Sequence, residues 1–276
     1  MSVVLPSLSE SALLLIGHGS TKNPDSSAPT REQLVALRQR GIFKEVHAGF
    51  RKEQPSIQEA LSCIESRIIY IVPNFISEGY FTKNVMPREL GLTGSASKID
   101  GRILIYCKPV GSHPKVTDII LHRAREIAPD ADLSKTSLIV VGHGTERDKN
   151  SSKAVRKQVS ILSEKEYFGE VLAAYMEEAP FIKDWAEVVK FPDVIVVPFF
   201  ISDGLHSYED IPVLLGISEA GKTQPLSESQ TVFDKNPYQI AEKKLCYTRA
   251  IGTEPGFTDI IVDQARQARE KENHTI

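Results

Sequence analysis

Two stretches decide the fold: Leu13-Leu14-Leu15-Ile16-Gly17-His18-Gly19 and Leu138-Ile139-Val140-Val141-Gly142-His143-Gly144. Each is a short apolar run, typical of a buried strand, that ends in the tripeptide Gly-His-Gly. The second lies 125 positions after the first, and the same offset aligns residues 72–79 (VPNFISEG) with residues 197–204 (VPFFISDG). A shared register of this length indicates an internal duplication.

The offset widens towards the C-terminus. Residues 111–120 match residues 252–261 at an offset of 141, so the second copy holds 16 additional residues between Pro212 and Gly252. Residues 218–244 are rich in Ser, Glu, Lys, Gln and Pro, which predicts a surface insertion. We expect it either to cover a site in the second copy or to form a plain flexible loop.

Strand-like runs alternate with helical patterns in both copies, which predicts an α/β fold with two tandem doubly wound parallel-sheet domains. The expected domains are residues 1–130 and 131–276. Expected strands are 12–16, 45–50, 68–73 and 103–107, then 137–141, 171–176, 194–199 and 245–251. Expected helices are 30–40, 55–67, 84–92 and 114–127, then 150–162, 180–189, 208–215 and 255–271.

Composition narrows the class of protein. An apolar fraction of 41%, a charged fraction of 25% and a formal net charge of −3 are ordinary for a globular chain, so we expect neither a nucleic-acid nor a membrane partner. No apolar stretch approaches the ~20 residues that cross a bilayer, and we expect a cytoplasmic protein. The isolated cysteines Cys63, Cys107 and Cys246 suit reduced core thiols, so an iron–sulfur cluster is not expected.

Three ligand-type side chains follow successive strands of the second copy: His143, Glu177 and His206. Parallel strands bring such residues to one sheet edge, and two imidazoles with a carboxylate suit a borderline divalent metal bound with open coordination positions. Glu178 follows Glu177, and either glutamate can supply the carboxylate. We assign both the metal-binding and the catalytic role to the set of three.

The first copy has different residues at the matching positions. His18 is retained, but Lys52 followed by Glu53, and then Phe81, replace the other ligands. We therefore expect an incomplete metal site in the first half and interpret His18 as a hydrogen-bonded structural residue.

A run of cations follows the second Gly-His-Gly. Arg147, Lys149 and Arg156 are candidate partners for substrate carboxylates, although a solvated helix face is the commoner explanation for such a run.

These motifs resemble the class II tetrapyrrole chelatases, the family of sirohydrochlorin cobaltochelatase and ferrochelatase, in its two-domain form. The resemblance rests on residues 142–144, 175–177, 197–212 and 251–255, and it spans most of the chain. It implies that His143, Glu177 and His206 handle the metal. In two-domain bacterial members the complete site is usually in the N-terminal half, whereas here it is in the C-terminal half. The spacing from Glu177 to Pro180 is also one residue shorter than the common pattern.

The resemblance implies a lyase that inserts Co²⁺ or Fe²⁺, with Ni²⁺ as a further candidate, as substrate metal into sirohydrochlorin or a related tetrapyrrole, for cobalamin or siroheme biosynthesis. We expect the macrocycle to bind in a cleft between the halves of a monomer or homodimer. One alternative is a non-catalytic tetrapyrrole or metal carrier that uses the same pocket. An unrelated metal-assisted hydrolase is disfavoured because the sequence has no clear nucleophile motif.

Overall fold

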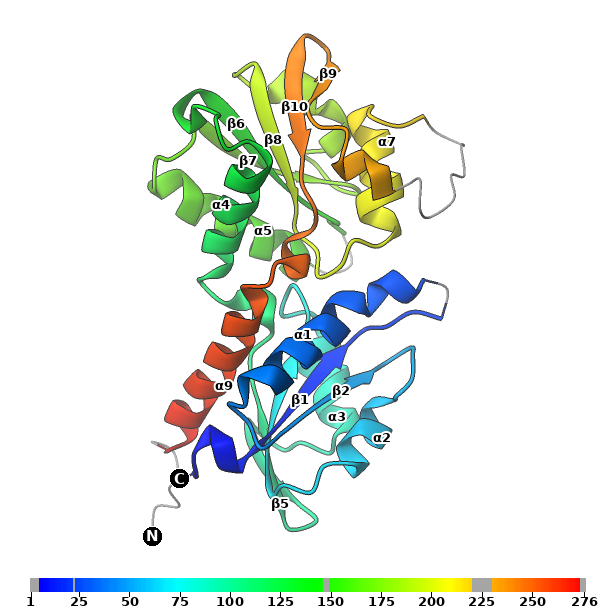
Figure 1. The fold of residues 1–276 in the computed structure, drawn as a ribbon, viewed down its shortest axis with the longest axis vertical. Helices are drawn as coiled ribbons and strands as arrows, with labels where there is room; N and C mark the ends of the chain where they lie inside the picture. The colour runs from blue at the N-terminus through cyan, green and yellow to red at the C-terminus, as the bar shows by residue number, and fades with distance from the viewer. Residues whose placement is uncertain (1–4, 22, 146–148, 220–229, 274–276) are drawn as a thin grey trace. The chain divides into compact units, whose positions relative to one another are not determined.

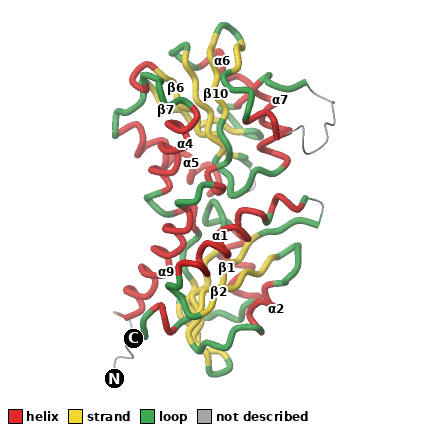
Figure 2. The backbone as a smooth tube through the Cα atoms, in the orientation of Figure 1, coloured by secondary structure: helices red, strands yellow, loops and turns green. Residues whose placement is uncertain are grey.

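A computed structural model describes residues 5–21, 23–145, 149–219 and 230–273. It has two compact units, Met1–His113 with Pro255–Ile276, and Pro114–Glu254. Each unit is built on a five-stranded sheet (Figures 1 and 2).

The first unit has the strand order β2-β1-β3-β5-β4. Helices α1 and α9 pack together over one face, while α2 and α3 supply apolar side chains to the core on the other. Its strands are β1 (Ala12–Gly17), β2 (Glu45–Phe50), β3 (Ile68–Pro73), β4 (Ala96–Ile99) and β5 (Arg102–Tyr106). Its helices are α1 (Ala28–Arg40), α2 (Ile57–Ser62), α3 (Met86–Glu89), preceded by a π-helical turn (Phe81–Val85), and α9 (Phe257–Asn273).

The second unit repeats this order as β7-β6-β8-β10-β9. Helices α4 and α5 pack together on one face, and α6 and α7 contribute to the core on the other. Its strands are β6 (Thr136–Gly142), β7 (Glu170–Tyr175), β8 (Asp193–Pro198), β9 (Tyr238–Ile240) and β10 (Lys243–Tyr247). Its helices are α4 (Val116–Ile127), α5 (Lys149–Glu164), α6 (Trp185–Val188) and α7 (Ile211–Leu215), preceded by a second π-helical turn (His206–Asp210).

The predicted α/β class is confirmed, with one difference in the sheets. Four strands of each sheet are parallel, but β4 and β9 run antiparallel to β5 and β10. Both are short edge strands, and a tight turn is enough to join them to the next strand. Neither strand was expected from the sequence. Strand β9 lies inside residues 218–244, the predicted surface insertion.

The strand registers confirm the duplication. Ala12 pairs with Glu45 in the first sheet, and Ser137 pairs with Glu170 in the second, 125 positions later. The tyrosine hydroxyls at the ends of β5 and β10 make matching bonds, Tyr106 to the carbonyl of Thr82 and Tyr247 to that of Ser207. Backbone and side-chain contacts are therefore repeated together.

The last helix of each sequence repeat belongs to the other repeat's unit. Helix α4 follows β5 in the chain but contacts α5 and β8, whereas α9 follows β10 but contacts α1, β3 and β5. Both helices are amphipathic, and their buried residues cover the sheet that they reach. The compact units thus differ from the expected division at residue 130, because that division assigns each helix to the repeat that encodes it.

Part of the insertion in the second repeat packs in the core. Gly91 and Gly216 end equivalent helices in the left-handed conformation, so the additional residues lie between Gly216 and β9. Residues 220–229 lie outside the described residues. Val232 and Phe233, just beyond them, are buried in the core of the second unit, which a plain flexible loop does not provide.

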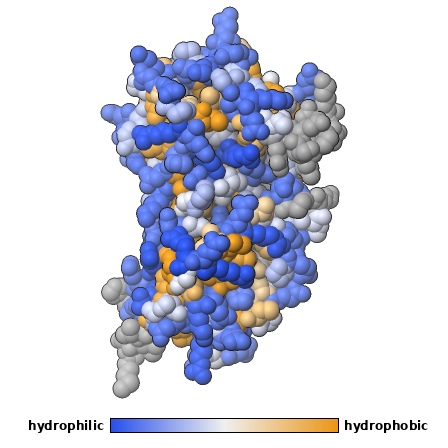
Figure 3. All heavy atoms as spheres, viewed as in Figure 1, coloured by the Kyte–Doolittle hydropathy of each residue, from blue (hydrophilic) through white to orange (hydrophobic). Residues whose placement is uncertain are grey.

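Hydrophilic residues predominate on the face drawn in Figure 3. Among the described helices, none is both long and apolar enough to span a bilayer. All three cysteines are free thiols; Cys107 and Cys246 are buried as expected, but Cys63 is exposed at the end of α2.

Candidate metal and substrate site

The predicted site residues lie at the carboxyl edge of the second sheet. After β6 the chain first adds β7 on one side and then β8 on the other, so the strand order changes direction between β6 and β8. Ligands of doubly wound sheets bind at such a point. His143 directly follows β6, and His206 opens the π-helical turn after β8.

The two imidazoles face each other. The ring centroids of His143 and His206 are 5.0 Å apart with an interplanar angle of 79°, an edge-on arrangement. His143 Nδ1 lies 2.8 Å from the carbonyl oxygen of Gly144, and His206 Nδ1 lies 2.6 Å from Oδ2 of Asp210. Because both partners accept hydrogen bonds, they assign the hydrogen of the neutral ring to Nδ1. Each neutral ring then presents the lone pair of Nε2, the atom that can bind a metal or accept a proton.

Glu177 lies beside His143. Its Oε2 is 3.6 Å from His143 Nδ1, and its side chain is 59% exposed. The carboxylate therefore approaches the ring on the Nδ1 side. Sharing a metal bound at Nε2 requires a different rotamer, which an exposed side chain can adopt.

Glu178 points elsewhere and has a counterpart in the first unit. Its Oε1 is 4.0 Å from Arg156, and its side chain is only 16% exposed. Glu53, 125 positions earlier, contacts Arg31 at 2.6 Å, and Arg31 is the counterpart of Arg156. In both units an arginine of the helix before the strand (α1 or α5) thus pairs with a glutamate of the loop after the strand (β2 or β7), which supports a structural role for Glu178.

The second glycine of each Gly-His-Gly is required by the backbone. Gly19 and Gly144 have φ of +64° and +69°, a left-handed conformation that favours glycine. A Cβ at Gly144 would lie 2.7 Å from side-chain atoms of Tyr175 and Glu178. The tripeptide therefore repeats because the turn must pass close to the neighbouring strand.

The equivalent edge of the first unit has only one imidazole. The His18 ring lies edge-on to Phe75, with centroids 6.4 Å apart, and Phe75 in turn contacts Phe81, the counterpart of His206. His18 Nδ1 has the same contact with the following glycine as His143 has, at 2.9 Å. The backbone turn and its histidine are retained, while Phe81 replaces His206 and Lys52 replaces Glu177.

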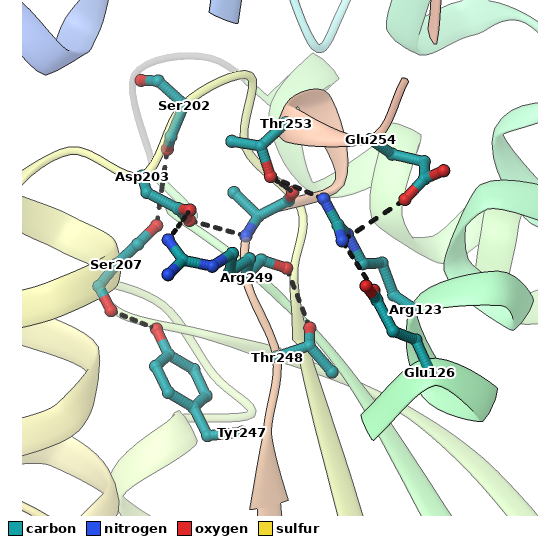
Figure 4. Close-up of polar contacts among 11 residues, drawn as sticks. Arg123, Glu126, Ser202, Asp203, Ser207, Tyr247, Thr248, Arg249, Thr253 and Glu254 are labelled. Atoms are coloured by element: carbon teal, nitrogen blue, oxygen red, sulfur yellow. Dashed lines mark hydrogen bonds and ion pairs between the residues drawn. The ribbon is translucent and has the colours of Figure 1, made fainter. Parts of the chain in front are cut away.

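The three predicted ligands do not form a closed metal cage. The described part of the chain has one group of three ligand-type side chains with all ligand atoms within 4.8 Å of one another: His122, Glu126 and Glu254. Arg123 forms ion pairs with both carboxylates of that group, since its Nη1 lies 2.6 Å from Glu126 and 3.3 Å from Glu254 (Figure 4). We interpret it as an ion-pair network with His122 at its edge.

Figure 4 also shows how Asp203 fixes the loop that precedes His206. Burial raises the pKa of the Asp203 carboxyl, against the opposing effects of the Ala250 N–H, which donates to it at 2.6 Å, and of the Arg249 guanidinium at 3.5 Å. Its counterpart in the first unit, Glu78, pairs with Lys83 at 3.1 Å instead. The loop after β8 is thus bound to the segment after β10.

The predicted cation cluster is only partly described. Arg147 lies outside the described residues, and Lys149 begins helix α5. Arg156 lies over the ring of Tyr175 at 5.8 Å and donates to its hydroxyl at 3.3 Å. These contacts and the ion pair with Glu178 account for Arg156 structurally, and its role towards a substrate stays a prediction.

Sequence reasoning missed Asp210 as a site residue. Its contact with His206 joins residues four positions apart on one helical turn. The spacing His-x-x-x-Asp was a readable signal, and the first repeat has lost both members, as Phe81 and Val85.

Solved structures place the fold among chelatases. A chain described as DR2241 from Deinococcus radiodurans, a multi-domain protein with structural similarity to chelatases, aligns with a TM-score of 0.75 and 26% identity over 92% of this chain, which spans about half (54%) of that protein. The cobalt complex of the sirohydrochlorin chelatase SirB from Bacillus subtilis subspecies spizizenii aligns over 95% of this chain and 96% of its own, with a TM-score of 0.62 and 18% identity. The latter likeness concerns the fold alone.

The chain belongs to the CbiX family, whose model matches it twice, over residues 12–127 and 137–268. A relative from Halobacterium salinarum, named as a probable sirohydrochlorin cobaltochelatase, is 37% identical over 93% of this chain and 91% of its own length. A Methanopyrus kandleri sirohydrochlorin cobaltochelatase is 28% identical over 42% of this chain and 95% of its own. The resemblance to two-domain class II chelatases is therefore confirmed, and each family match ends in a helix that packs in the other unit.

Proposed function

We propose that this chain is a sirohydrochlorin chelatase that inserts cobalt or iron, and that His143, His206 and Glu177 carry the reaction. Family membership and the 37% identical relative support the reaction class. One observation carries the assignment to residues: two imidazoles face each other at 5.0 Å at the point where the strand order changes direction.

The proton balance of the reaction explains why two imidazoles are useful. A divalent metal that enters a free-base macrocycle replaces two pyrrole N–H protons, so two protons must leave. His143 and His206 each have Nδ1 engaged and Nε2 available, and a neutral imidazole is suited to accept a proton near neutral pH. Both can also hold the incoming metal through Nε2 before transfer, since imidazole suits cobalt and iron.

Glu177 supplies negative charge to the same place. Its carboxylate attracts a hydrated dication and, at 3.6 Å from His143 Nδ1, stabilises the imidazolium that forms when His143 accepts a proton. An exposed carboxylate can reorient between these two roles, in contrast to the half-buried Glu178.

The test is a multiple-turnover assay. The purified chain is mixed with excess sirohydrochlorin and with Co²⁺, Fe²⁺ or Ni²⁺ in turn, and the visible absorption bands are followed. We expect product in excess of protein with cobalt or iron, and a loss of turnover in His206→Ala. Colour change that stops at one equivalent of protein would favour a carrier.

His122→Ala is the matched control, because His122 is an exposed histidine of the same unit with carboxylates nearby. Its turnover should equal that of the unaltered chain. If His122→Ala lost activity while His206→Ala retained it, the metal site would have to be assigned to His122, Glu126 and Glu254 instead.

A further inference from the structure

The first unit holds a cavity that the proposed metal site does not use. Its volume is about 470 Å³, within the range of small-molecule sites. It lies beyond the end of β5, between the π-helical turn at Phe81–Val85 and the approach to β4. Its lining includes Thr82, Lys83, Leu92, Ser95, Lys108 and Lys271.

The walls of this cavity are held in place. Tyr106 donates its hydroxyl to the carbonyl of Thr82 at 2.7 Å, and Ser95 donates its hydroxyl to Glu272 at 2.6 Å, a residue that is only 4% exposed. Because strand, π-helical turn and α9 are linked by these bonds, the cavity is preformed.

The charge of the lining favours an anion. Three of the lining residues are lysines, Lys83, Lys108 and Lys271, and one is acidic, Glu78. Glu78 lies 3.1 Å from Lys83 and partly neutralises it, which leaves Lys108 as the main cationic contribution from the sheet edge. Leu92 and two prolines add apolar wall, so the lining suits a carbon skeleton that carries several carboxylates.

The second unit fills the same place with its own side chains. Tyr247 and Arg249 are the counterparts of Tyr106 and Lys108. Phe233 stacks on Tyr247 with centroids 5.5 Å apart, and Arg249 lies 4.7 Å above the Phe233 ring. The side-chain amide of Asn236 bonds the backbone of Tyr247 in both directions. One repeat is therefore packed where the other has a cationic cavity.

We propose that the cavity of the first unit binds a small organic polyanion, a di- or tricarboxylate, through Lys108 with Lys83 and Lys271. This inference is independent of the metal site, since it uses none of its residues. Binding should weaken with added salt, as expected for a contact between exposed charges.

Isothermal titration calorimetry of the full chain at low ionic strength provides the test, with citrate and inorganic phosphate as probes. We expect citrate to bind with a Kd of about 0.1 mM and phosphate to bind at least about tenfold more weakly, because it fills less of the cavity. Equal or tighter binding of phosphate, or no binding of citrate, would overturn the proposal.

Three variants locate the site. Lys108→Gln should weaken citrate binding about tenfold, whereas Lys98→Gln, on the exposed edge strand β4 and outside the lining, should leave it unchanged. Leu92→Phe should weaken binding by filling the volume without a change of charge. Thermal unfolding verifies that each variant is folded. Equal effects of Lys98→Gln and Lys108→Gln would reveal unspecific charge attraction and refute the site.

Discussion

The two Gly-His-Gly edges have the same backbone and different chemistry. In both units a left-handed glycine follows the histidine, and an arginine from the next helix pairs with the second of two loop residues, Glu53 or Glu178. The first of those loop residues is Lys52 in one unit and Glu177 in the other. The duplication therefore retained the side chains that hold the loop and changed those that face outward.

The changes at the outward positions are also linked to one another. Where the second unit has His206 with its partner Asp210, the first has Phe81 and Val85, and Phe81 packs against Phe75. The candidate ligand His206 and the carboxylate in contact with it are thus both absent from the first unit. This correlation is the strongest internal argument that the second edge is the reactive one.

Removing the shared histidine from each edge should have very different effects on metal insertion. His143→Ala should lower the rate of metal insertion about a thousandfold, because it removes a proton acceptor and a metal-binding nitrogen at once. His18→Ala should change the rate less than about twofold. Both are measured under multiple turnover. Comparable losses would mean that the two edges act as equals.

The filled and open cavities can be compared by truncating the residue that fills one of them. Phe233→Ala should lower the free energy of unfolding by about 3 kcal/mol, since Phe233 is only 6% exposed and stacks on Tyr247. Leu92→Ala, at the wall of the open cavity, should cost about 1–2 kcal/mol. Thermal and urea unfolding measure both. The reverse ranking would show that the insertion contributes little to packing.

The two neighbouring glutamates give a sharper version of the same contrast. Glu177→Gln should lower the insertion rate about thirtyfold with no loss of thermal stability. Glu178→Gln should leave the rate within about twofold but reduce stability by about 1 kcal/mol, as should Glu53→Gln in the first unit. If Glu178→Gln lowered the rate more than Glu177→Gln, the roles assigned to the two residues would have to be exchanged.

Asp210 is expected to act through His206, so its removal should lower the rate less than removal of His143 or the change at Glu177. Asp210→Ala should lower the insertion rate about tenfold, because His206 loses the acceptor that fixes its Nδ1 hydrogen. Asp210→Asn should recover part of the rate, since an amide oxygen also accepts that hydrogen bond. Stability should be unchanged, given that Asp210 is half-exposed. An Asn variant no better than the Ala variant would argue that charge, and not orientation, is what matters.

The strands and the switch-point edge were predictable from the sequence because buried parallel strands appear as continuous apolar runs with the same period in both repeats. His143 and His206 follow from this, since strand ends determine which residues meet. The edge strand β4 was not predictable: of its residues Ala96–Ile99 only Ser97, a polar residue, is buried, and they carry no apolar run.

Two other features depend on contacts that no local pattern encodes. Glu177 and Glu178 are adjacent, and only the counterpart pair of Arg31 and Glu53 shows which of them faces the helix. The exchange of α4 and α9 also leaves no trace in helical periodicity, because an amphipathic helix can cover either sheet equally well. Sequence patterns therefore did not reveal which residues and helices, far apart in the sequence, pack against each other.

The exchange of α4 and α9 determines when each unit can finish folding during synthesis. The sheet of the first unit is complete when β5 leaves the ribosome, but α9, which covers one of its faces, is made only after the whole of the second unit. The second unit has all its parts by Glu254 and can fold while the first still exposes apolar surface. A nascent chain of this protein therefore carries an incomplete first unit until α9 is made, and any stop codon before α9 leaves that unit unfinished even though its own strands are intact.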